Sequence, residues 1–214
     1  MREERVGGWA MILAAGMGLV TMAFHPTGQE TLADFQRVAP INVAAHALAL
    51  LAIPIAFFGA LALPRRLADA PGLARFGLVA YGMSQVAVMI AAVASGLLAT
   101  ALYARVLGSP GAEADGARLL LGFTGMLNHA FATVYVAASS LAIGAWSVAM
   151  WRTRAFPRWL AAPGLVIGGA LIGITLAGRL RLDVHHFGMV VIAQAAWLVG
   201  TGIALVRTAR APAE

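Results

Sequence analysis

The sequence has no cysteine and no lysine, and only 11% of its 214 residues are charged. Without cysteine the chain can form neither disulfide bonds nor thiolate metal sites, so a bound metal would need imidazole, carboxylate or thioether ligands. A hydrophobic content of 61% and a mean hydropathy of +0.83 exclude an ordinary soluble domain with a polar surface. We therefore expect a single integral membrane domain over residues 1–214.

All 15 basic residues are arginine, which gives the chain a formal charge of +6 at pH 7. Nucleic-acid binding needs a solvated basic face, but these arginines stand singly or in short groups between long apolar runs. Their placement indicates a role in membrane topology. The expected partners are the lipid bilayer and a small molecule or metal ion, and no nucleic acid.

Six apolar runs are long enough to cross a bilayer, which takes about 20 helical residues. They do not alternate between apolar and polar residues, so helices are expected rather than the strands of a barrel. The sequence thus predicts an all-α fold, a polytopic bundle of six transmembrane helices. The predicted spans are residues 8–24, 41–63, 76–103, 119–151, 159–178 and 184–206.

The fourth predicted span has more residues than one perpendicular crossing needs. Its first turns, residues 118–125, are therefore expected to extend beyond the hydrocarbon or to tilt. The second predicted span contains Pro54, and proline removes a helical hydrogen bond. We expect this residue to break its helix near the middle of the membrane.

The first apolar run follows the charged segment 2–5, a layout that signal peptides share. It lacks a small-residue cleavage site before His25, so it is predicted to remain as the first span. With the N-terminus inside, ten of the 15 arginines fall on the cytoplasmic side, in agreement with the positive-inside rule. The prediction is a multi-pass protein of the inner (cytoplasmic) membrane with both termini in the cytoplasm.

The histidines fall near one depth of this predicted bundle. His46, His129 and His186 each precede the arginine that closes their span by 19 to 23 residues. At a rise of 1.5 Å per residue, each lies near the far side of a hydrocarbon core about 30 Å thick. His25 and His185 fall at the same depth. The five residues predict an outward-facing, histidine-rimmed cavity on the periplasmic or exterior face.

A transition-metal site used for redox chemistry or metal handling is the first hypothesis for this cavity. Three imidazoles with an open position suit zinc or copper, and nearby thioethers favour Cu(I). The predicted ligands are His46, His129 and His186, with His25, His185, Met126 and Met189 as further candidates. The groups expected to orient the rings are Asn42, Asn128 and Asp183, which lie beside the histidines or at helical spacing from them.

Haem b held between two helices is the second hypothesis, with His46 and His129 as its axial ligands. Small residues such as Ala45 and Gly125 lie beside these histidines and would let a macrocycle approach. Small residues also let membrane helices pack closely, so they do not by themselves indicate haem.

A cofactor-free transporter or binding protein is a hypothesis of a different class. Transporters often contain repeated halves, and a span, an arginine loop and a second span recur in residues 41–98 and 128–178. A proton-coupled pump needs a continuous ionisable path, which the sequence does not supply. Polar groups on the cytoplasmic half are few, namely Ser84, Gln85, Ser139, Ser140, Ser147 and Gln194.

A membrane hydrolase is the remaining alternative, and whether the chain is an enzyme stays open. Metal-bound water would need a base, for which Asp183 is the candidate, with Glu30 or Asp34 in its place. The sequence contains no H-E-x-x-H, G-x-S-x-G, Walker A or dinucleotide-binding motif. The hypothesis therefore has no motif to support it.

Overall fold

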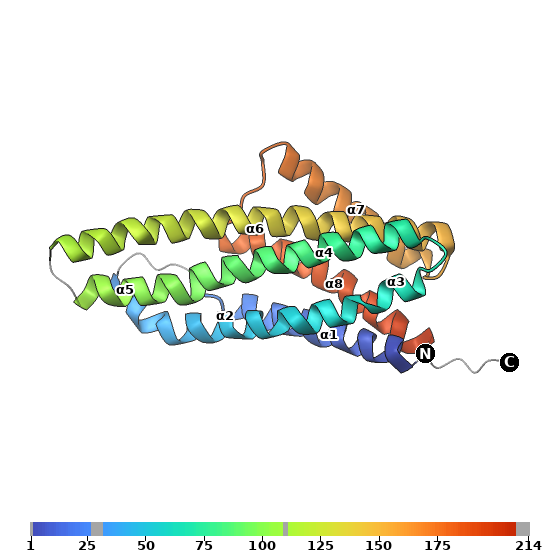
Figure 1. Cartoon of the computed structure of the whole chain (residues 1–214), viewed down its shortest axis with the longest axis horizontal. Coiled ribbons are helices and arrows are strands. Elements are labelled where there is room, and N and C mark those ends of the chain that lie inside the picture. Colours follow the sequence, from blue (N-terminus) through green and yellow to red (C-terminus); the bar gives the residue numbers. More distant parts are fainter. Residues whose placement is uncertain (1, 27–31, 109–110, 209–214) are drawn as a thin grey trace.

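The computed structural model describes all residues except 1, 27–31, 109–110 and 209–214, and the described part forms helices and no strand. Figure 1 shows these helices as one elongated bundle. The elements are α1 (Arg2–Ala23), α2 (Leu32–Ala60), α3 (Ala62–Arg66), α4 (Pro71–Ala92), the π-helical turn η1 (Val93–Leu98), α5 (Ala99–Gly108), α6 (Ala112–Thr153), α7 (Arg158–Leu176) and α8 (Val184–Thr208).

Six helices of the described chain are long and apolar enough to cross a membrane. The predicted all-α fold with six such helices is therefore confirmed, and it indicates a multi-pass membrane protein. The helices run past the predicted spans at several ends: the third apolar helix covers Pro71–Val106 and the fourth covers Glu113–Thr153. The side of the membrane on which each terminus lies stays a prediction.

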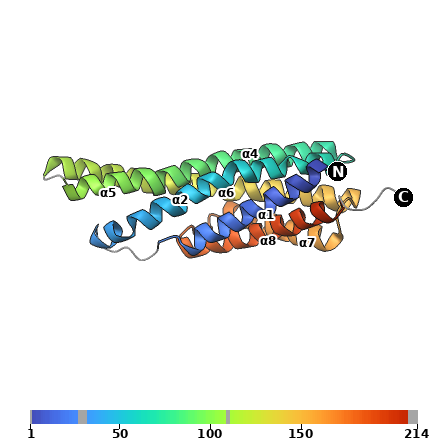
Figure 2. The ribbon, with the colours of Figure 1, turned by 90° about the horizontal axis from the view of Figure 1, so that it is seen from below.

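The long helices form a closed ring in which each one packs against its neighbours in sequence, and α8 closes the ring against α1 (Figures 1 and 2). Helix α1 lies between α2 and α8, and α6 lies between α4 and α7. Of the neighbouring long helices, α7 and α8 touch each other least. In such a ring of helices no helix occupies the centre, so side chains fill it.

Glycine permits a close approach of two backbones in this ring, between α1 and α8. A Cβ atom added at Gly8 would lie 2.6 Å from the carbonyl oxygen of Gly202, and one added at Gly202 would lie 2.6 Å from the carbonyl oxygen of Gly8. Membrane helices gain stability from such contacts because van der Waals packing replaces the hydrophobic effect that lipid does not supply. The two helices are thereby held tightly along this face.

Two buried tryptophans fill the centre of the bundle toward its end near α3. The indole rings of Trp146 on α6 and Trp197 on α8 stack with their centroids 6.3 Å apart. Each indole N–H donates to a backbone carbonyl, Trp146 to Ala74 at 3.1 Å and Trp197 to Leu160 at 3.1 Å. These bonds satisfy the polar edge of each ring and join α4, α6, α7 and α8.

Helices α5 and α6 extend together beyond the ends of the other helices (Figures 1 and 2). Helix α6 has 42 residues, about 63 Å at 1.5 Å per residue, which is twice the thickness of the hydrocarbon core. Whether its first turns extend beyond the hydrocarbon or the helix tilts stays a prediction. Helix α2, in contrast, continues through Pro40 and Pro54 without interruption, so the predicted break at Pro54 is wrong.

Candidate functional site

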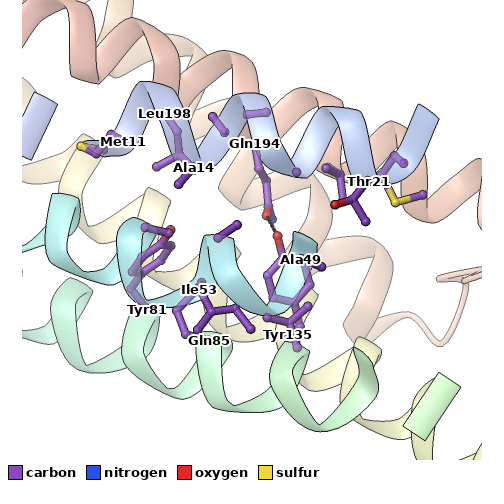
Figure 3. A pocket seen from close by; sticks show the side chains of 18 of the residues that line it. Met11, Ala14, Thr21, Ala49, Ile53, Tyr81, Gln85, Tyr135, Gln194 and Leu198 are labelled. Carbon is purple, nitrogen blue, oxygen red and sulfur yellow. Dashed lines mark hydrogen bonds between the residues drawn. The ribbon is translucent and has the colours of Figure 1, made fainter. Parts of the chain in front are cut away.

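A cavity of about 130 Å³ lies between α1, α2, α4, α6 and α8. Most of its lining is apolar, and α1 and α2 contribute several small residues to it, including Ala14, Gly18, Ala49 and Ala52. Figure 3 shows the larger side chains of Tyr81, Gln85 and Tyr135 on the side of the cavity opposite α1. The small residues of α1 and α2 leave space that the ring of helices does not fill.

A closed chain of hydrogen bonds forms one polar wall of the cavity. The hydroxyl of Tyr135 on α6 donates to Oε1 of Gln194 on α8 at 2.9 Å (Figure 3), and Nε2 of Gln194 donates to Oγ of Ser139 at 2.8 Å. Ser139 in turn donates to the backbone carbonyl of Tyr135 at 2.7 Å. Because the Tyr135 oxygen only donates in this chain, its lone pairs remain able to accept a hydrogen bond.

Tyr81 and Gln85 on α4 form a second polar wall. The ring of Tyr81 is buried against Trp146, with centroids 5.4 Å apart, and Figure 3 shows its hydroxyl directed across the cavity toward α1. This hydroxyl has no hydrogen-bond partner within the described residues. Nε2 of Gln85 donates to Oγ of Ser84 at 3.3 Å, and its carbonyl oxygen likewise accepts no bond within that part of the chain. The cavity therefore contains an unused donor and an unused acceptor.

A histidine pair lies at the end of α1 beyond this cavity. The rings of His25 and His46 meet edge to face with centroids 5.0 Å apart. Thr21, which lines the cavity, donates to the carbonyl of Ala45 at 3.3 Å and so fixes α1 against α2 beside the pair. His46 is only 5% exposed.

Both ring nitrogens of His46 have partners. Nδ1 lies 2.8 Å from the backbone carbonyl of Asn42, and Nε2 lies 2.8 Å from Oγ of Ser95. A carbonyl only accepts, so Nδ1 carries a hydrogen. Ser95 also lies 2.9 Å from the carbonyl of Ala91. Its single hydroxyl hydrogen points to Nε2 when His46 is neutral, and to Ala91 when Nε2 is protonated as well.

The π-helical turn η1 makes room for this histidine. A Cβ atom at Gly96 would lie 2.3 Å from Cβ and Cγ of His46, so only glycine fits there. The amide of Asn42 donates to the carbonyl of Ser95 at 3.3 Å and to Oγ1 of Thr100 at 3.1 Å. A π-helical turn leaves carbonyls without their usual partners, and the Asn42 amide satisfies one of them.

The other predicted histidines do not join this pair. His129 is exposed on α6 and its carbonyl accepts a bond from Thr133 at 2.9 Å, while Asn128 beside it is half-buried. His185 is exposed near the start of α8. Among the described residues, no three histidine, aspartate or glutamate side chains are grouped closely enough to hold a metal ion. Met126 and Met189, the predicted thioether ligands, are both exposed.

Asp183 and His186 form a local structure of their own. Oδ1 of Asp183 accepts the backbone N–H groups of His185 at 3.1 Å and His186 at 3.0 Å, so Asp183 is the N-cap of α8. Its Oδ2 lies 2.6 Å from Nδ1 of His186. The predicted helical spacing thus brings the two side chains together, in a capping contact on the surface. Glu30, the other candidate base, lies outside the described residues.

The pKa values of Asp183 and His25, which lie outside the membrane spans, are both lowered, for different reasons. The hydrogen bonds from the backbone and ring of His186 lower the pKa of Asp183. Burial lowers the pKa of His25, against the opposing effect of its hydrogen bond to the Pro26 carbonyl. His25 is therefore neutral at pH 7, and its Nδ1–H points to a backbone oxygen.

Sequence reasoning did not single out the two tyrosines of the cavity. The sequence marks Gln85 and Gln194 only as two of the few polar groups on the cytoplasmic half of the spans. Tyr81 and Tyr135 carry a polar atom on a large apolar ring, and each stands within a long apolar run. That signal marks both residues, although it does not show that their helices face one cavity.

Comparison with known proteins finds no relative: no protein-family model, no curated protein and no solved structure matches the chain. The function must therefore be inferred from the geometry of the cavity and of the histidine pair.

Proposed function

We propose that this protein binds a small, mainly apolar molecule carrying one hydrogen-bonding group, and that it does so without a cofactor in the cavity at the centre of the bundle. The observation that carries this proposal is the pairing of an apolar cavity with the unused hydroxyl of Tyr81 and the unused amide oxygen of Gln85. Buried polar groups without partners are costly, so a ligand that supplies partners is favoured.

The size of the cavity limits the ligand. Pockets for drug-sized molecules measure about 300–1,000 Å³, whereas an engineered apolar cavity of about 150 Å³ binds benzene. The cavity of about 130 Å³ therefore suits a molecule about the size of phenol. Such a molecule partitions into the bilayer, which is consistent with a binding protein or carrier for membrane-soluble compounds.

The experiment uses 4-fluorophenol as the probe and the full chain in lipid nanodiscs. We expect ¹⁹F NMR to detect a bound state that empty nanodiscs lack. A neutral hydrogen bond contributes about 0.5–1.5 kcal/mol, so Tyr81→Phe should weaken binding about two- to thirteen-fold. The matched control is Tyr103→Phe, because Tyr103 lies on α5 away from the cavity lining.

A cavity-filling variant separates specific binding from partition into lipid. Ala52→Phe places a ring among the lining residues and should abolish the bound signal. If wild-type protein and Ala52→Phe give the same spectrum, or if Tyr103→Phe weakens binding as much as Tyr81→Phe does, the proposal is wrong.

Metal or haem binding at the histidine pair is a second candidate. In both His25 and His46, Nδ1 lies within hydrogen-bond distance of a backbone carbonyl, which is the arrangement that orients a neutral imidazole to coordinate through Nε2. In His46 a ligand would have to displace Ser95 from Nε2. Elemental analysis and an absorption spectrum of wild type and His46→Gln test this: the candidate requires metal or haem that the variant loses.

The proposed location is the inner membrane, with the histidine pair facing the periplasm or exterior and both termini in the cytoplasm. The distribution of arginine along the sequence supports this orientation. Reporter fusions test it at the loop between α6 and α7, residues 154–157. A reporter active on the outside at this loop would reverse the assignment.

A further inference from the structure

Helices α7 and α8 enclose a groove on the side of the bundle. Figure 1 shows α7 leaning away from the other helices toward its C-terminal end. A cavity of about 460 Å³ lies between the two helices there. It is separate from the central cavity, since α7 contributes nothing to the lining of the latter.

The groove is apolar along most of its length. Val166, Ala170 and Ile174 line it from α7 at intervals of one turn, and Met189 and Ala193 line it from α8. From Val166 to Ile174 the helix rises by eight residue steps, about 12 Å. Val166 is 69% exposed and Met189 58% exposed, so this apolar surface is covered only if something from outside the chain fills the groove.

The other end of the groove is basic. Arg179, Arg181 and His186 line its mouth. Both arginines are exposed and form no ion pair within the described residues. The nearby carboxylate of Asp183 is engaged by the N-terminus of α8 and by His186. Two arginines thus face the groove mouth with their charges unpaired.

The local sequence explains why Arg179 lies at this mouth. Gly178 has a φ of +64°, a conformation that glycine adopts without strain. Its N–H donates to the carbonyl of Thr175 at 3.0 Å, and the N–H of Arg179 donates to that of Ile174 at 3.1 Å. This pair of bonds is the Schellman motif that ends helices at glycine. It reverses the chain at the last turn of α7, so Arg179 stands beside the residues that line the groove.

We propose that the α7–α8 groove binds one anionic phospholipid, with an acyl chain along the apolar groove and the phosphate between Arg179 and Arg181. A lipid without net charge would leave the two positive charges uncompensated, and a free phosphate would leave the apolar groove uncovered. Guanidinium groups bind phosphate oxygens through paired hydrogen bonds. The groove and its mouth together therefore match a molecule that has both parts.

Native mass spectrometry of the full chain in detergent, titrated with phosphatidylglycerol or phosphatidylcholine, tests the proposal. Wild type should retain one phosphatidylglycerol more tightly than phosphatidylcholine. An arginine near an anionic headgroup contributes about 1 kcal/mol, a factor of about five in affinity. The double variant Arg179→Gln/Arg181→Gln should therefore weaken phosphatidylglycerol binding about 25-fold and phosphatidylcholine binding by less, because the choline ammonium offsets the charge of that lipid's phosphate.

Two controls distinguish lipid binding in the groove from non-specific binding through surface charge or through exposed apolar residues. Arg105→Gln/Arg118→Gln removes two exposed arginines elsewhere and should leave both affinities unchanged. Ala170→Trp fills the groove and should weaken retention of phosphatidylglycerol, whereas Val79→Trp on the exposed face of α4 should not. Thermal unfolding of each variant verifies that it is folded.

Three results would overturn the proposal. Wild type that binds both lipids equally shows no headgroup selection. Equal losses in the two double-arginine variants indicate general surface charge. Competition by millimolar inorganic phosphate indicates an anion site that needs no acyl chain. None of these results affects the central cavity, so the two proposals fail independently.

Discussion

His46 and Tyr81 are both buried polar residues on apolar helices, yet their surroundings differ. His46 has a partner for each ring nitrogen, in Asn42 and Ser95, and packs against Gly96. The Tyr81 hydroxyl faces a cavity. A polar group whose hydrogen bonds are complete stabilises helix packing, whereas one with an open hydrogen bond can recognise a ligand.

This difference changes how polar residues in an apolar run are interpreted. Their cost in hydrocarbon makes each a functional candidate, but the cost is removed as readily by a neighbouring helix as by a ligand. His46 shows the first case, since Asn42 on α2 and Ser95 on η1 supply its partners. Tyr81 fits the second case. Variants of both sites test whether His46 is structural and Tyr81 is free to bind a ligand.

The largest effect is expected from closing the space around His46. In Gly96→Leu the new side chain would overlap the imidazole, because even a Cβ atom would lie 2.3 Å from it. Overpacking of a core costs about 1–3 kcal/mol, occasionally more. Unfolding in mixed micelles should show at least this loss, while Gly122→Ala, where a Cβ atom meets nothing within 4 Å, should not destabilise the protein. Equal stability of Gly96→Leu and wild type would contradict the packing around His46.

A smaller effect on the free energy of unfolding is expected when His46→Leu is compared with Tyr81→Phe. The first variant loses two hydrogen bonds, each worth about 0.6 kcal/mol between membrane helices, and should lower the free energy of unfolding by about 1–2 kcal/mol. The second loses none within the described chain and should change it by less than about 0.5 kcal/mol. The same mixed-micelle unfolding measures both. If Tyr81→Phe destabilised the protein as much as His46→Leu, the hydroxyl would have a structural partner and the proposed recognition group would be lost.

The smallest effect concerns Asp183, a polar residue whose partners are complete but exposed. Because its pKa is lowered in the folded protein, its stabilising effect is present above the unfolded-state pKa of about 3.9 and is lost as the pH falls through the lower folded-state pKa. Hydrogen exchange of the His185 and His186 amides should therefore be faster in Asp183→Ala at pH 7. Asp183→Asn, which keeps a capping oxygen, should exchange more slowly than Asp183→Ala. Identical rates in all three proteins would remove the capping role.

The candidate site was predicted only in part, because the sequence predicts contacts within one helix but not contacts between helices. Contacts within one helix follow from spacing, so Asp183 with His186 and Asn42 with His46 were predicted as neighbours. The contact between His46 and Asn42 nevertheless uses the backbone carbonyl of Asn42, because its side chain turns to η1. The convergence of His46, His129 and His186 needs contacts between helices, which helical spacing does not determine.

The sequence by itself determined the number of long apolar helices and the all-helical fold, because the apolar surface of each run and its backbone hydrogen bonds are properties of that run alone. Only the tertiary structure decided that His25 meets His46, that Tyr81 and Tyr135 face one cavity, and that α7 leans away from α8. These features depend on how each helix is rotated about its axis and which neighbour it meets. Packing between helices, such as the close contact of Gly8 with Gly202, decides both, and such packing joins residues that lie far apart in the chain.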